Sequence, residues 1–427
     1  MSSSRRSFLH GAAAAALSAS RVMGANDRIN VLVVGTGGRG TDHIDEYAKL
    51  PGARLAGVCD IDQAARERAV ARVEKLTGEK PKQWTDMREA FADKDVDAVS
   101  IAAPNHWHAL ATIWACRAGK DVYVEKPASY NIHEGQRMVE VARQTGRMVQ
   151  VGSQGRSTAH KIKAMQLLRD GAIGRVYMAK GLCFKRRKSI GHKEDSPVPP
   201  GVNWDLFLGP APLRPFNELR FKYNWHWFWD TGNGDIGNQG VHEMDTCRWG
   251  MGELGWPKSV VSTGGKYLYS DDQETPNTQN AVFDFGDRQV VFEVRGLITG
   301  EEGRLNHAGN NVVANLFYGS DGWMAVDGNG FQVYKGENSQ LATDEKAVIS
   351  YDTGAHMANF LAACRSRRYQ DLHADIAMGA MSAAFCHMAN ASYRVGRRLT
   401  VEAPGRFAGD DEANRLLTRK YREPYVV

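Results

Sequence analysis

The feature that most constrains the fold is a glycine-rich turn between a short apolar run and a helical stretch. Ile29–Val34 is a short apolar run, interrupted only by Asn30, as expected of a strand buried in a parallel sheet. Residues 35–40 follow it directly, read GTGGRG and match the pattern G-x-G-x-x-G. Such glycines let a diphosphate approach the backbone amides of a helix N-terminus, where a Cβ would block it. The turn predicts a dinucleotide site lined by Gly35, Gly37, Gly38, Arg39 and Gly40.

Strand-like and helix-like stretches alternate from residue 28 to about residue 151. Strands are expected at Leu55–Cys59, Ala98–Ala102, Val122–Val124 and Met148–Val151, and helices at Thr41–Leu50, Gln63–Leu76, His108–Ala118 and His133–Thr145. This βαβ alternation is typical of a doubly wound parallel sheet. We therefore predict a dinucleotide-binding Rossmann domain over residues 28–151.

An acidic residue selects between the two common dinucleotides. Asp60 ends the second predicted strand, 20 positions after Gly40. A carboxylate there accepts hydrogen bonds from the adenosine ribose and repels a 2′-phosphate, which favours NAD over NADP. Arg39 is a cation that would offset this preference by pairing with such a phosphate. The alternative is an ordinary glycine-rich turn with an incidental Asp.

The pattern changes after residue 152. A helix over about Ala159–Arg169 is followed by long strand patterns, one of which turns back on itself at Gly286-Asp287. These strands are expected at Val176–Phe184, Ser259–Leu268, Ala281–Leu297 and Val312–Tyr318, and two late helices at about Ala355–Ser366 and Ile376–Val395. Because a hairpin joins antiparallel strands, we predict an antiparallel sheet in a second domain over residues 152–427.

The first 25 residues resemble a twin-arginine export signal. Ser4-Arg5-Arg6-Ser7-Phe8-Leu9 precedes an alanine-rich stretch, with His10 where such signals usually have Lys. The alternative is a plain basic tail. Because the twin-arginine machinery carries folded proteins, the signal predicts a periplasmic enzyme that acquires its cofactor before export.

Composition excludes several classes of partner. Of the formal net charge of +5, three positive charges lie in the first 25 residues, which leaves too little to indicate nucleic acid or an anionic membrane as a partner. No run of about 18 apolar residues predicts a membrane span. The 6 cysteines form no C-x-x-C pair, and His106 and His108 have no further ligands at metal spacing. We therefore expect neither a disulfide framework nor a metal site.

Three further segments carry a family resemblance. Gly119–Pro127 reads GKDVYVEKP and is similar to the A-G-K-x-V-x-x-E-K-P signature of the Gfo/Idh/MocA oxidoreductases, which include glucose–fructose oxidoreductase and inositol dehydrogenase. Ala103–His108 is similar to their T-P-N-x-x-H segment, with Ala103 in place of Thr. Gly234–Asp245 resembles their G-x-x-x-D-x-G-x-H-x-x-D segment. Together with the glycine turn, these motifs follow the family order across most of the chain.

The resemblance implies an architecture and a class of substrate. A Rossmann domain precedes an α/β domain whose open, mostly antiparallel sheet is often an oligomer interface, so a homo-oligomer is expected. A carbohydrate or polyol lies between the domains, over the nicotinamide. The matching cofactor-binding residues are Pro104, Asn105, His108, Glu125 and Lys126.

The same resemblance assigns the catalytic residues. Lys126 lies near the reacting hydroxyl, where an ammonium orients an alcohol and stabilises a developing alkoxide, or where a desolvated amine acts as a base. His242 takes the hydroxyl proton. Asp245, three positions on, orients His242 or binds substrate. Asn238 stands where the family often has Asp; it cannot take a proton but can hydrogen-bond a sugar hydroxyl. Asp235 is in a different register and is not taken as its replacement.

Weaker assignments concern the substrate. Gln154 and Arg156 follow the last Rossmann strand, where the family often presents polar groups. The aromatic segment 223–230 supplies Trp225, His226 and Trp227 for contact with a pyranose, or else for core packing or an oligomer contact. The basic cluster Lys185–Lys188 is either a solvated loop or a gate for an anionic sugar.

Three functions remain open. The first is an NAD-dependent oxidoreductase acting on a sugar, glycoside or cyclitol, with cofactor held through turnover because the periplasm offers no dependable pool of free NAD. The second is a redox-neutral, NAD-dependent glycosidase or lyase that oxidises C3 transiently. The third is a non-catalytic sugar-binding protein that keeps NAD as structure, disfavoured because Lys126 and His242 are both present.

Overall fold

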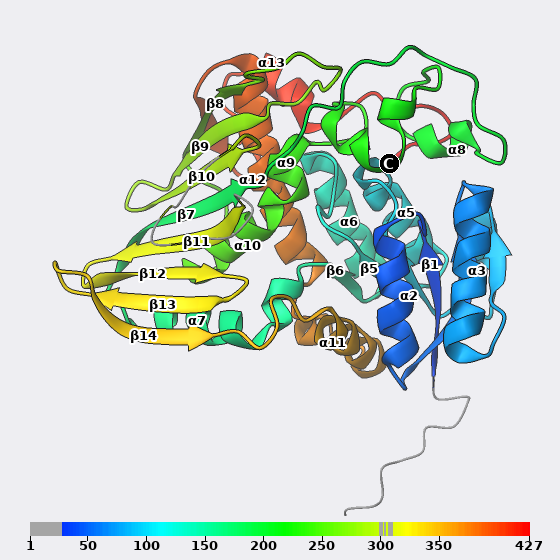
Figure 1. Ribbon diagram of the computed structural model, residues 1–427, viewed down its shortest axis with the longest axis horizontal. Coiled ribbons are helices and arrows are strands. Elements are labelled where there is room, and N and C mark those ends of the chain that lie inside the picture. Colours follow the sequence, from blue (N-terminus) through cyan, green and yellow to red (C-terminus); the bar gives the residue numbers. More distant parts are fainter. Residues whose placement is uncertain (1–27, 299–301, 303–304, 306–310) are drawn as a thin grey trace, which may run out of the picture.

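The computed structural model describes residues 28–298, 302, 305 and 311–427, so the predicted export signal at residues 1–25 lies outside the described residues. Two sheets lie at opposite ends of the molecule, with helices between them (Figure 1). One sheet has six strands in the order β3-β2-β1-β4-β5-β6, and the other has ten in the order β14-β13-β12-β11-β7-β10-β9-β8-β15-β16. The predicted fold class, a Rossmann sheet followed by a mostly antiparallel α/β domain, is confirmed.

The first sheet is parallel in every pairing. Its strands are β1 (Ile29–Val34), β2 (Ala53–Cys59), β3 (Lys82–Trp84), β4 (Ala98–Ile101), β5 (Asp121–Val124) and β6 (Val149–Val151). The connecting helices are α2 (Arg39–Lys49), α3 (Gln63–Thr77), α4 (Met87–Ala92), α5 (Asn105–Arg117) and α6 (Ile132–Thr145). Strand order reverses between β1 and β4, and ligands of such sheets bind in the crevice at that point.

Local sequence explains where these helices begin and end. Asp62 caps α3 by accepting from the amide of Ala64, and Asn131 caps α6 by accepting from the amide of Glu134. Gly78 and Gly146 end the same helices in the left-handed conformation. By contrast, α2 starts after Gly38 with no side-chain cap. The amides of its first turn are therefore available to a ligand.

The second sheet is antiparallel except where β7 and β10 run parallel. Its strands are β7 (Val176–Phe184), β8 (Ser259–Gly265), β9 (Thr278–Asp284), β10 (Gln289–Arg295), β11 (Val312–Gly319), β12 (Gly322–Asp327), β13 (Gly330–Lys335), β14 (Gln340–Lys346), β15 (Leu399–Glu402) and β16 (Arg406–Phe407). The predicted hairpin is β9–β10, joined through Gly286 at φ +92°. The sequence did not predict β12–β14; of these, β14 has only Leu341 and Ala342 as apolar residues and lacks an alternating apolar face.

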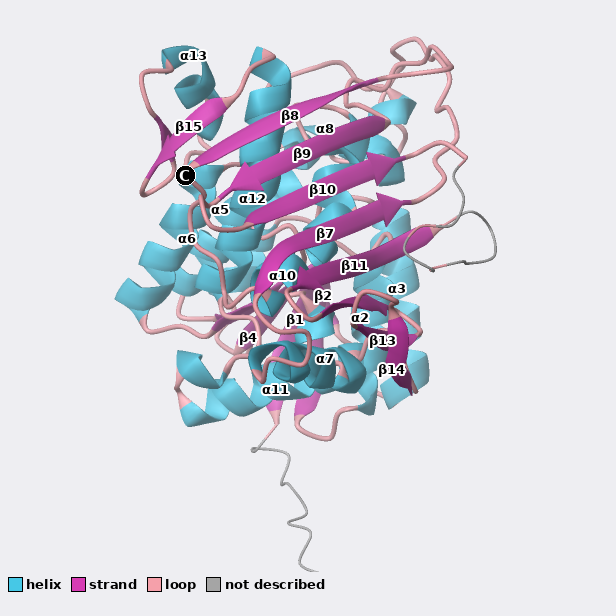
Figure 2. Ribbon diagram, turned by 90° about the vertical axis from the view of Figure 1, so that its left-hand side faces the viewer, coloured by secondary structure: helices cyan, strands magenta, loops and turns pink. Residues whose placement is uncertain are grey.

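Helices cover one face of this sheet, and none of the described helices lies over the face turned to the viewer in Figure 2. The longer helices are α7 (Ala159–Arg169), α10 (Gly240–Gly250), α11 (Thr353–Ser366) and α12 (Ile376–Val395), and the short ones are α8 (Trp204–Leu208), α9 (Gly234–Asn238) and α13 (Asp411–Asn414). The segment between β7 and α9 crosses back over the Rossmann domain (Figure 1). This return brings both domains to one site.

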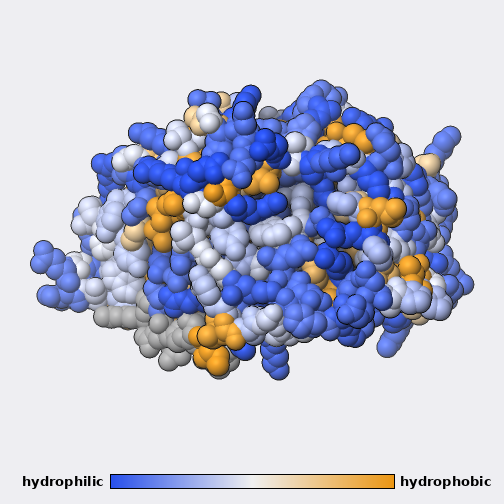
Figure 3. Space-filling view, turned by 90° about the horizontal axis from the view of Figure 1, so that it is seen from above, coloured by the Kyte–Doolittle hydropathy of each residue, from blue (hydrophilic) through white to orange (hydrophobic). Residues whose placement is uncertain are grey.

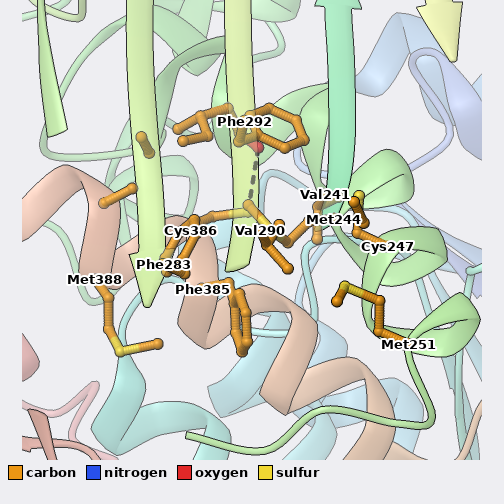
Figure 4. Packing of buried hydrophobic residues seen from close by; sticks show 14 of the residues in the cluster. Val241, Met244, Cys247, Met251, Phe283, Val290, Phe292, Phe385, Cys386 and Met388 are labelled. Atoms are coloured by element: carbon orange, nitrogen blue, oxygen red, sulfur yellow. Dashed lines mark hydrogen bonds between the residues drawn. The ribbon is translucent and has the colours of Figure 1, made fainter. Parts of the chain in front are cut away.

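The core between the sheet and its helices holds α9 and α10 in place. Met244 and Cys247 of α10 and Phe385 of α12 point toward Phe283 and Phe292 of the sheet (Figure 4). Fully burying a side chain of this size contributes roughly 1.5–3 kcal/mol. The Sγ of Cys386 donates to the Ile236 carbonyl at 3.2 Å, tying α12 to α9. All 6 cysteines of the chain are buried free thiols.

The surface agrees with a globular protein. The face seen from above is largely hydrophilic, with small separate apolar patches (Figure 3). None of the described helices is long and apolar enough to cross a membrane. Across the described residues, no group of three or more His, Cys, Asp or Glu side chains is placed to hold a metal ion.

Candidate active site between the two domains

The glycine turn fits a diphosphate because its glycines divide into two kinds. A Cβ on Gly40 would lie 2.0 Å from the Gly35 carbonyl oxygen, and one on Gly35 would lie 2.6 Å from the Ala103 nitrogen. These two glycines therefore let β1, α2 and the end of β4 approach closely. A Cβ on Gly38 would meet nothing within 4 Å, and one on Gly37 only Ala65 at 4.0 Å. The open side of the turn lies beside the uncapped start of α2, where a dinucleotide diphosphate would bind.

Asp60 follows β2 and is buried, as the ribose assignment requires. Its Oδ2 accepts from the amide of Thr36 at 2.6 Å and from the Thr36 hydroxyl at 3.1 Å, while Oδ1 accepts from the amide of Asp62 at 2.9 Å. Burial raises its pKa. The carboxylate thus also braces the glycine turn, a role that sequence reasoning missed, and it keeps lone pairs for a ribose.

Arg39, the cation considered for a 2′-phosphate, has its donors engaged elsewhere. Its Nε donates to Glu125 Oε1 at 3.1 Å, and its terminal nitrogens donate to Asp42 and Thr353. A different cation, Arg66, donates to the backbone carbonyl of Asp60 at 2.8 Å. Arg39 therefore offers little to NADP, which leaves the preference for NAD set by Asp60.

The end of β4 supplies a second candidate contact with the cofactor. Pro104 precedes α5, and Asn105 opens its first turn. Asn105 Nδ2 donates to Asn233 Oδ1 at 2.5 Å, while its own Oδ1 is buried with no hydrogen-bond partner among the described residues. A buried acceptor without a donor is costly, and a bound cofactor would supply one. The site is therefore suited to NAD at this end as well.

His108 lies one turn further along α5 and braces the backbone. Its Nδ1 lies 2.7 Å from the Pro127 carbonyl oxygen and its Nε2 lies 2.8 Å from the Ala103 carbonyl oxygen. Burial lowers the pKa of His108. The side chain joins the turns that follow β4 and β5, which holds Lys126 in place; its contact with a cofactor stays a prediction.

Glu125 is the centre of a buried polar network on the Rossmann side. Its Oε1 accepts from Arg39, from Gln154 Nε2 at 3.0 Å, and pairs with His43 Nε2 at 3.1 Å. Burial by itself would raise the pKa of Glu125, but the charge of Arg39 and the contact with His43 hold that pKa well below its usual range. Gln154 also donates to Tyr123, so both contacts of its amide nitrogen lie within the protein.

Lys126 and His242 come from different domains and converge. Lys126 follows β5 and is joined to Pro127 by a cis peptide bond, and its Nζ donates to the Asn238 carbonyl at 3.0 Å, where α9 ends. Burial lowers the pKa of Lys126. Burial and the nearby charge of Lys126 together hold the pKa of His242 well below its usual value. A neutral imidazole and a partly desolvated amine thus share one region between the domains.

Asp245 is held by hydrogen bonds from Arg156 and Ser382. Its two oxygens accept from Arg156 at 2.8 and 2.9 Å and from the Ser382 hydroxyl at 2.7 Å. Arg156 also pairs with Glu253 at 2.7 Å. Burial alone would raise the pKa of Asp245, but the charge and hydrogen bonds of Arg156 lower it. In the described residues no hydrogen bond joins Asp245 to His242, so its role as an orienting or substrate residue stays a prediction, as does that of Arg156.

Asn238 is held by side chains from two segments. Its Nδ2 donates to the Tyr223 hydroxyl at 3.3 Å and to Asp235 Oδ1 at 3.4 Å. Asp235 in turn forms a bidentate pair with Arg187, at 2.7 and 2.8 Å. The carboxylate of Asp235 is therefore engaged and does not replace the Asp that the family often has at position 238.

The aromatic segment lies over this region as the 3₁₀ helix η4 (Lys222–Trp227). The rings of Trp225 and His226 stack with centroids 3.6 Å apart, and Arg187 stands over the Trp227 ring at 5.1 Å. Burial, and the charges of Lys126 and Arg187, lower the pKa of His226 to about 3. Trp225 and His226 are partly exposed and Trp227 is buried. Contact with a sugar stays a prediction for all three.

Sequence reasoning missed a second group of polar side chains beside His242. Burial raises the pKa of Glu243 to about 7, and its carboxyl group lies 3.4 Å from the Tyr351 hydroxyl and 3.5 Å from Gln239 Nε2. The Tyr351 ring lies 5.6 Å from the His242 ring, and Lys161 Nζ lies 4.3 Å from the Tyr351 ring centre. Gln239 and Glu243 fall on unspecified positions of the motif at residues 234–245, and Lys161 and Tyr351 lie outside the family motifs, which is why no signal marked them.

The fold and the glycine turn define a class: an NAD-binding Rossmann protein of the oxidoreductase type. Residues 29–153 match the family described as "Oxidoreductase family, NAD-binding Rossmann fold", and residues 164–262 and 311–427 match its C-terminal alpha/beta domain. The chain belongs to the Gfo/Idh/MocA oxidoreductase family, as its motifs predicted.

Individual relatives are similar over part of the chain. A glycosyl hydrolase family 109 protein of Shewanella sp. (strain W3-18-1) is 27% identical over 178 residues, 40% of this chain and 39% of the relative. An alpha-N-acetylgalactosaminidase of Shewanella oneidensis is 27% identical over 176 residues, 39% of this chain and 38% of the relative. The chain thus spans about two fifths of the length of these relatives.

Solved structures are similar over nearly the whole chain and show the fold. The WlbA dehydrogenase of Bordetella pertussis, in complex with NADH and UDP-GlcNAcA, has a TM-score of 0.64 at 20% identity, covering 88% of this chain and 99% of that one. A putative myo-inositol dehydrogenase of Sinorhizobium meliloti has a TM-score of 0.59 at 18% identity, covering 88% of this chain and 100% of that one.

Proposed function

We propose that the protein is an NAD-dependent oxidoreductase that acts on a hydroxyl group of a sugar, glycoside or cyclitol. The observation that carries this proposal is the convergence of Lys126 and His242, from two domains, beside a glycine turn and a buried Asn105 oxygen suited to NAD. Relatives and structural neighbours named for sugar-related activities support the class of substrate.

Lys126, His242 and Asn238 have different roles toward the substrate hydroxyl groups. NAD, when bound, accepts a hydride from the carbon that is oxidised. The Lys126 ammonium holds the hydroxyl oxygen and stabilises negative charge as it develops there. Because burial keeps His242 neutral, its imidazole can accept the hydroxyl proton. Asn238 offers an amide to a neighbouring sugar hydroxyl.

A strap from the second domain supports the proposal that the cofactor is held through turnover. The backbone N–H of Gln63 donates to the Gly201 carbonyl at 2.9 Å, and the backbone N–H of Asn203 donates to the Ile61 carbonyl at 3.0 Å. These bonds lay residues 199–205 along the loop that follows β2, next to Asp60 and beside a cavity of about 520 Å³. An adenosine bound there would lie against this strap, and that contact would slow its release.

The test begins with the native protein. Mass spectrometry should find NAD released on denaturation, and a panel of sugars and cyclitols should reduce the bound nicotinamide. Lys126→Met should retain bound NAD but lose about 10³-fold in turnover, the size of a general acid–base or alkoxide-stabilising contribution. Lys49→Met, which removes an exposed lysine paired with Glu46, is the matched control and should leave turnover unchanged. Unchanged turnover in Lys126→Met would refute the proposed mechanism, and a protein that binds sugars without reducing NAD would be a binding protein.

A second candidate is a redox-neutral, NAD-dependent glycosidase or lyase, which the similarity to glycosyl hydrolase family 109 proteins favours. Transient oxidation at C3 would acidify the C–H at C2, and elimination would expel the aglycone, which takes up a proton. In a glycosidase, water would then add at C1 before the hydride returned to C3; in a lyase, the unsaturated sugar would remain. Incubation with aryl glycosides and no added NAD separates the two: aglycone release supports the glycosidase, and net nicotinamide reduction without release supports the oxidoreductase.

We further propose export to the periplasm by the twin-arginine machinery and assembly into a homo-oligomer. The paired Arg5-Arg6 and the following Phe8-Leu9 support the export route, and the helix-free face of the ten-stranded sheet supports the assembly. Arg5→Lys with Arg6→Lys should hold the protein in the cytoplasm, as measured by cell fractionation. Light scattering of the holoenzyme should give at least twice the mass of one chain, which is 47.2 kDa before any signal is removed, and the mass of a single chain would contradict the assembly.

A further inference from the structure

The buried cations around the site fall into two sets. Arg39, Arg156 and Arg187 each face a carboxylate, on Glu125, Asp245 and Asp235 respectively. In the described parts of the chain, no ion pair to a carboxylate is formed by three lysines around the first turns of α10: Lys126, Lys161 and Lys185. These three lysines therefore have no described carboxylate in direct contact, although Glu125 lies near Lys126 and Glu243 lies near Lys161.

Lys161 is the clearest of the three. The side chain comes from α7 and is 3% exposed, and within the described residues its Nζ makes no hydrogen bond. The Nζ is nevertheless not among the fully enclosed unpartnered atoms, so it reaches accessible space. It stands on the Tyr351 ring, which His242 also contacts. A buried ammonium without an acceptor is costly, and the cost is relieved when a ligand supplies an anion.

Lys185 approaches the same helix from the other side. Its Nζ donates to Gln239 Oε1 at 3.1 Å, and the Gln239 carbonyl accepts from the His242 amide at 3.1 Å. Gln239 also reaches Glu243, so side chains run continuously from Lys185 to Tyr351 and Lys161. The two ammonium groups thus stand at the two ends of a series of side-chain contacts that passes along the turn of α10 carrying His242.

We propose that the sugar bound at this site carries an anionic substituent, a carboxylate or a phosphate ester, and that Lys161, with Lys185, binds it. This inference rests on the proposed function and narrows its class of substrate. Lys161 is then a specificity-determining residue outside the family motifs. The anion supplies the acceptor that Lys161 lacks, and its charge opposes that of the three lysines.

The test compares matched substrates on the NAD-loaded enzyme. Glucuronate and galacturonate, their neutral methyl esters, the parent hexoses and glucose 6-phosphate are titrated, and the readouts are KM, kcat and the dissociation constant from calorimetry. We expect an anionic sugar to bind about tenfold more tightly than its neutral counterpart, with an advantage that shrinks as salt is added. Uronates and glucose 6-phosphate identify which anion is the ligand.

Two variants test whether the preference for an anionic sugar depends on Lys161. Lys161→Gln should raise the KM for the anionic sugar about tenfold and leave KM for the neutral sugar and kcat for both nearly unchanged. Lys163→Gln, on the same helix but exposed and paired with Glu345, should change neither. Equal losses on charged and neutral sugars in Lys161→Gln would overturn the inference.

The wild-type comparison needs no variant and decides the matter if Lys161→Gln does not fold. Equal affinity for anionic and neutral sugars would overturn this inference while leaving the oxidoreductase intact. Failure of every sugar, charged or neutral, to reduce the bound nicotinamide would instead contradict the proposed function.

Discussion

Two buried glutamates, one in each domain, show how differently the same side chain can be held. Glu125 follows β5, and three donors from Arg39, His43 and Gln154 converge on one of its oxygens. Glu243 lies on α10 and has only long contacts, 3.4 and 3.5 Å, with Tyr351 and Gln239. The pKa of Glu125 lies well below its usual range, whereas burial raises the pKa of Glu243 to about 7.

The difference teaches that burial alone does not decide the charge of a side chain. Desolvation disfavours both carboxylates, but a full set of donors and a guanidinium more than offset it for Glu125. Glu243 lacks such a set, so its charge changes near neutral pH. The first glutamate holds the Lys126 turn in one arrangement, and the second leaves the α10 side responsive to pH and to a bound ligand.

The largest expected effect comes from Glu125→Gln. The amide removes the buried carboxylate on which Arg39, His43 and Gln154 converge and leaves Arg39 only its exposed pair with Asp42, so the free energy of unfolding should fall by about 3 kcal/mol at pH 7. Because the folded pKa of Glu125 is depressed, its stabilisation is present above the ordinary value of 4.5 and is lost as the pH falls below it. Urea unfolding at pH 7 and pH 4 measures both effects.

Glu46→Gln is the control for this prediction, since Glu46 pairs with Lys49 on the surface of the same domain. It should change the free energy of unfolding by less than about 0.5 kcal/mol. A loss in Glu125→Gln no larger than that of Glu46→Gln would contradict the central place given to Glu125.

Glu243→Gln should act in the opposite direction and less strongly. The folded protein keeps Glu243 protonated up to about pH 7, while the unfolded chain ionises near 4.5, so ionisation penalises the fold increasingly as the pH rises from 4.5 to 7. Gln removes that penalty and should stabilise the protein at pH 8 by roughly 1–3 kcal/mol, with little change at pH 4.5. Thermal and urea unfolding across this range measure the slope, and destabilisation at pH 8 would show that Glu243 is charged and paired in the folded protein.

The smallest effect is expected from Tyr351→Phe, which keeps the ring beneath Lys161 but removes the hydroxyl group next to Glu243. The ionised carboxylate of Glu243 then loses a donor, so its pKa in the folded protein should rise. The free energy of unfolding should therefore go on falling to a higher pH, and at pH 8 it should change by about 1 kcal/mol or less. Tyr177→Phe, at an exposed position on β7, should leave the curve unchanged. A downward shift in Tyr351→Phe would mean that the hydroxyl group does not donate to Glu243.

Much of the fold could be predicted because its signals are local. The apolar run Ile29–Val34 is β1 to the residue, and Val176–Phe184 is β7 to the residue. The three-residue β3 and the polar β14 were not predicted, because neither carries an apolar periodicity of its own. Their positions depend on pairing with β2 and β13.

The sequence by itself determined the glycine turn, the parallel sheet around it, the acid at position 60 and the motif residues Lys126, Asn238 and His242, since each depends on short stretches of chain. Only the tertiary structure decided what those residues face: that Lys126 reaches the end of α9, that Asp245 is held by Arg156, and that Lys161 stands on the Tyr351 ring without an ion pair to any described carboxylate. The physical reason is that charge, burial and hydrogen bonding depend on neighbours brought together from distant parts of the chain, which no local pattern records.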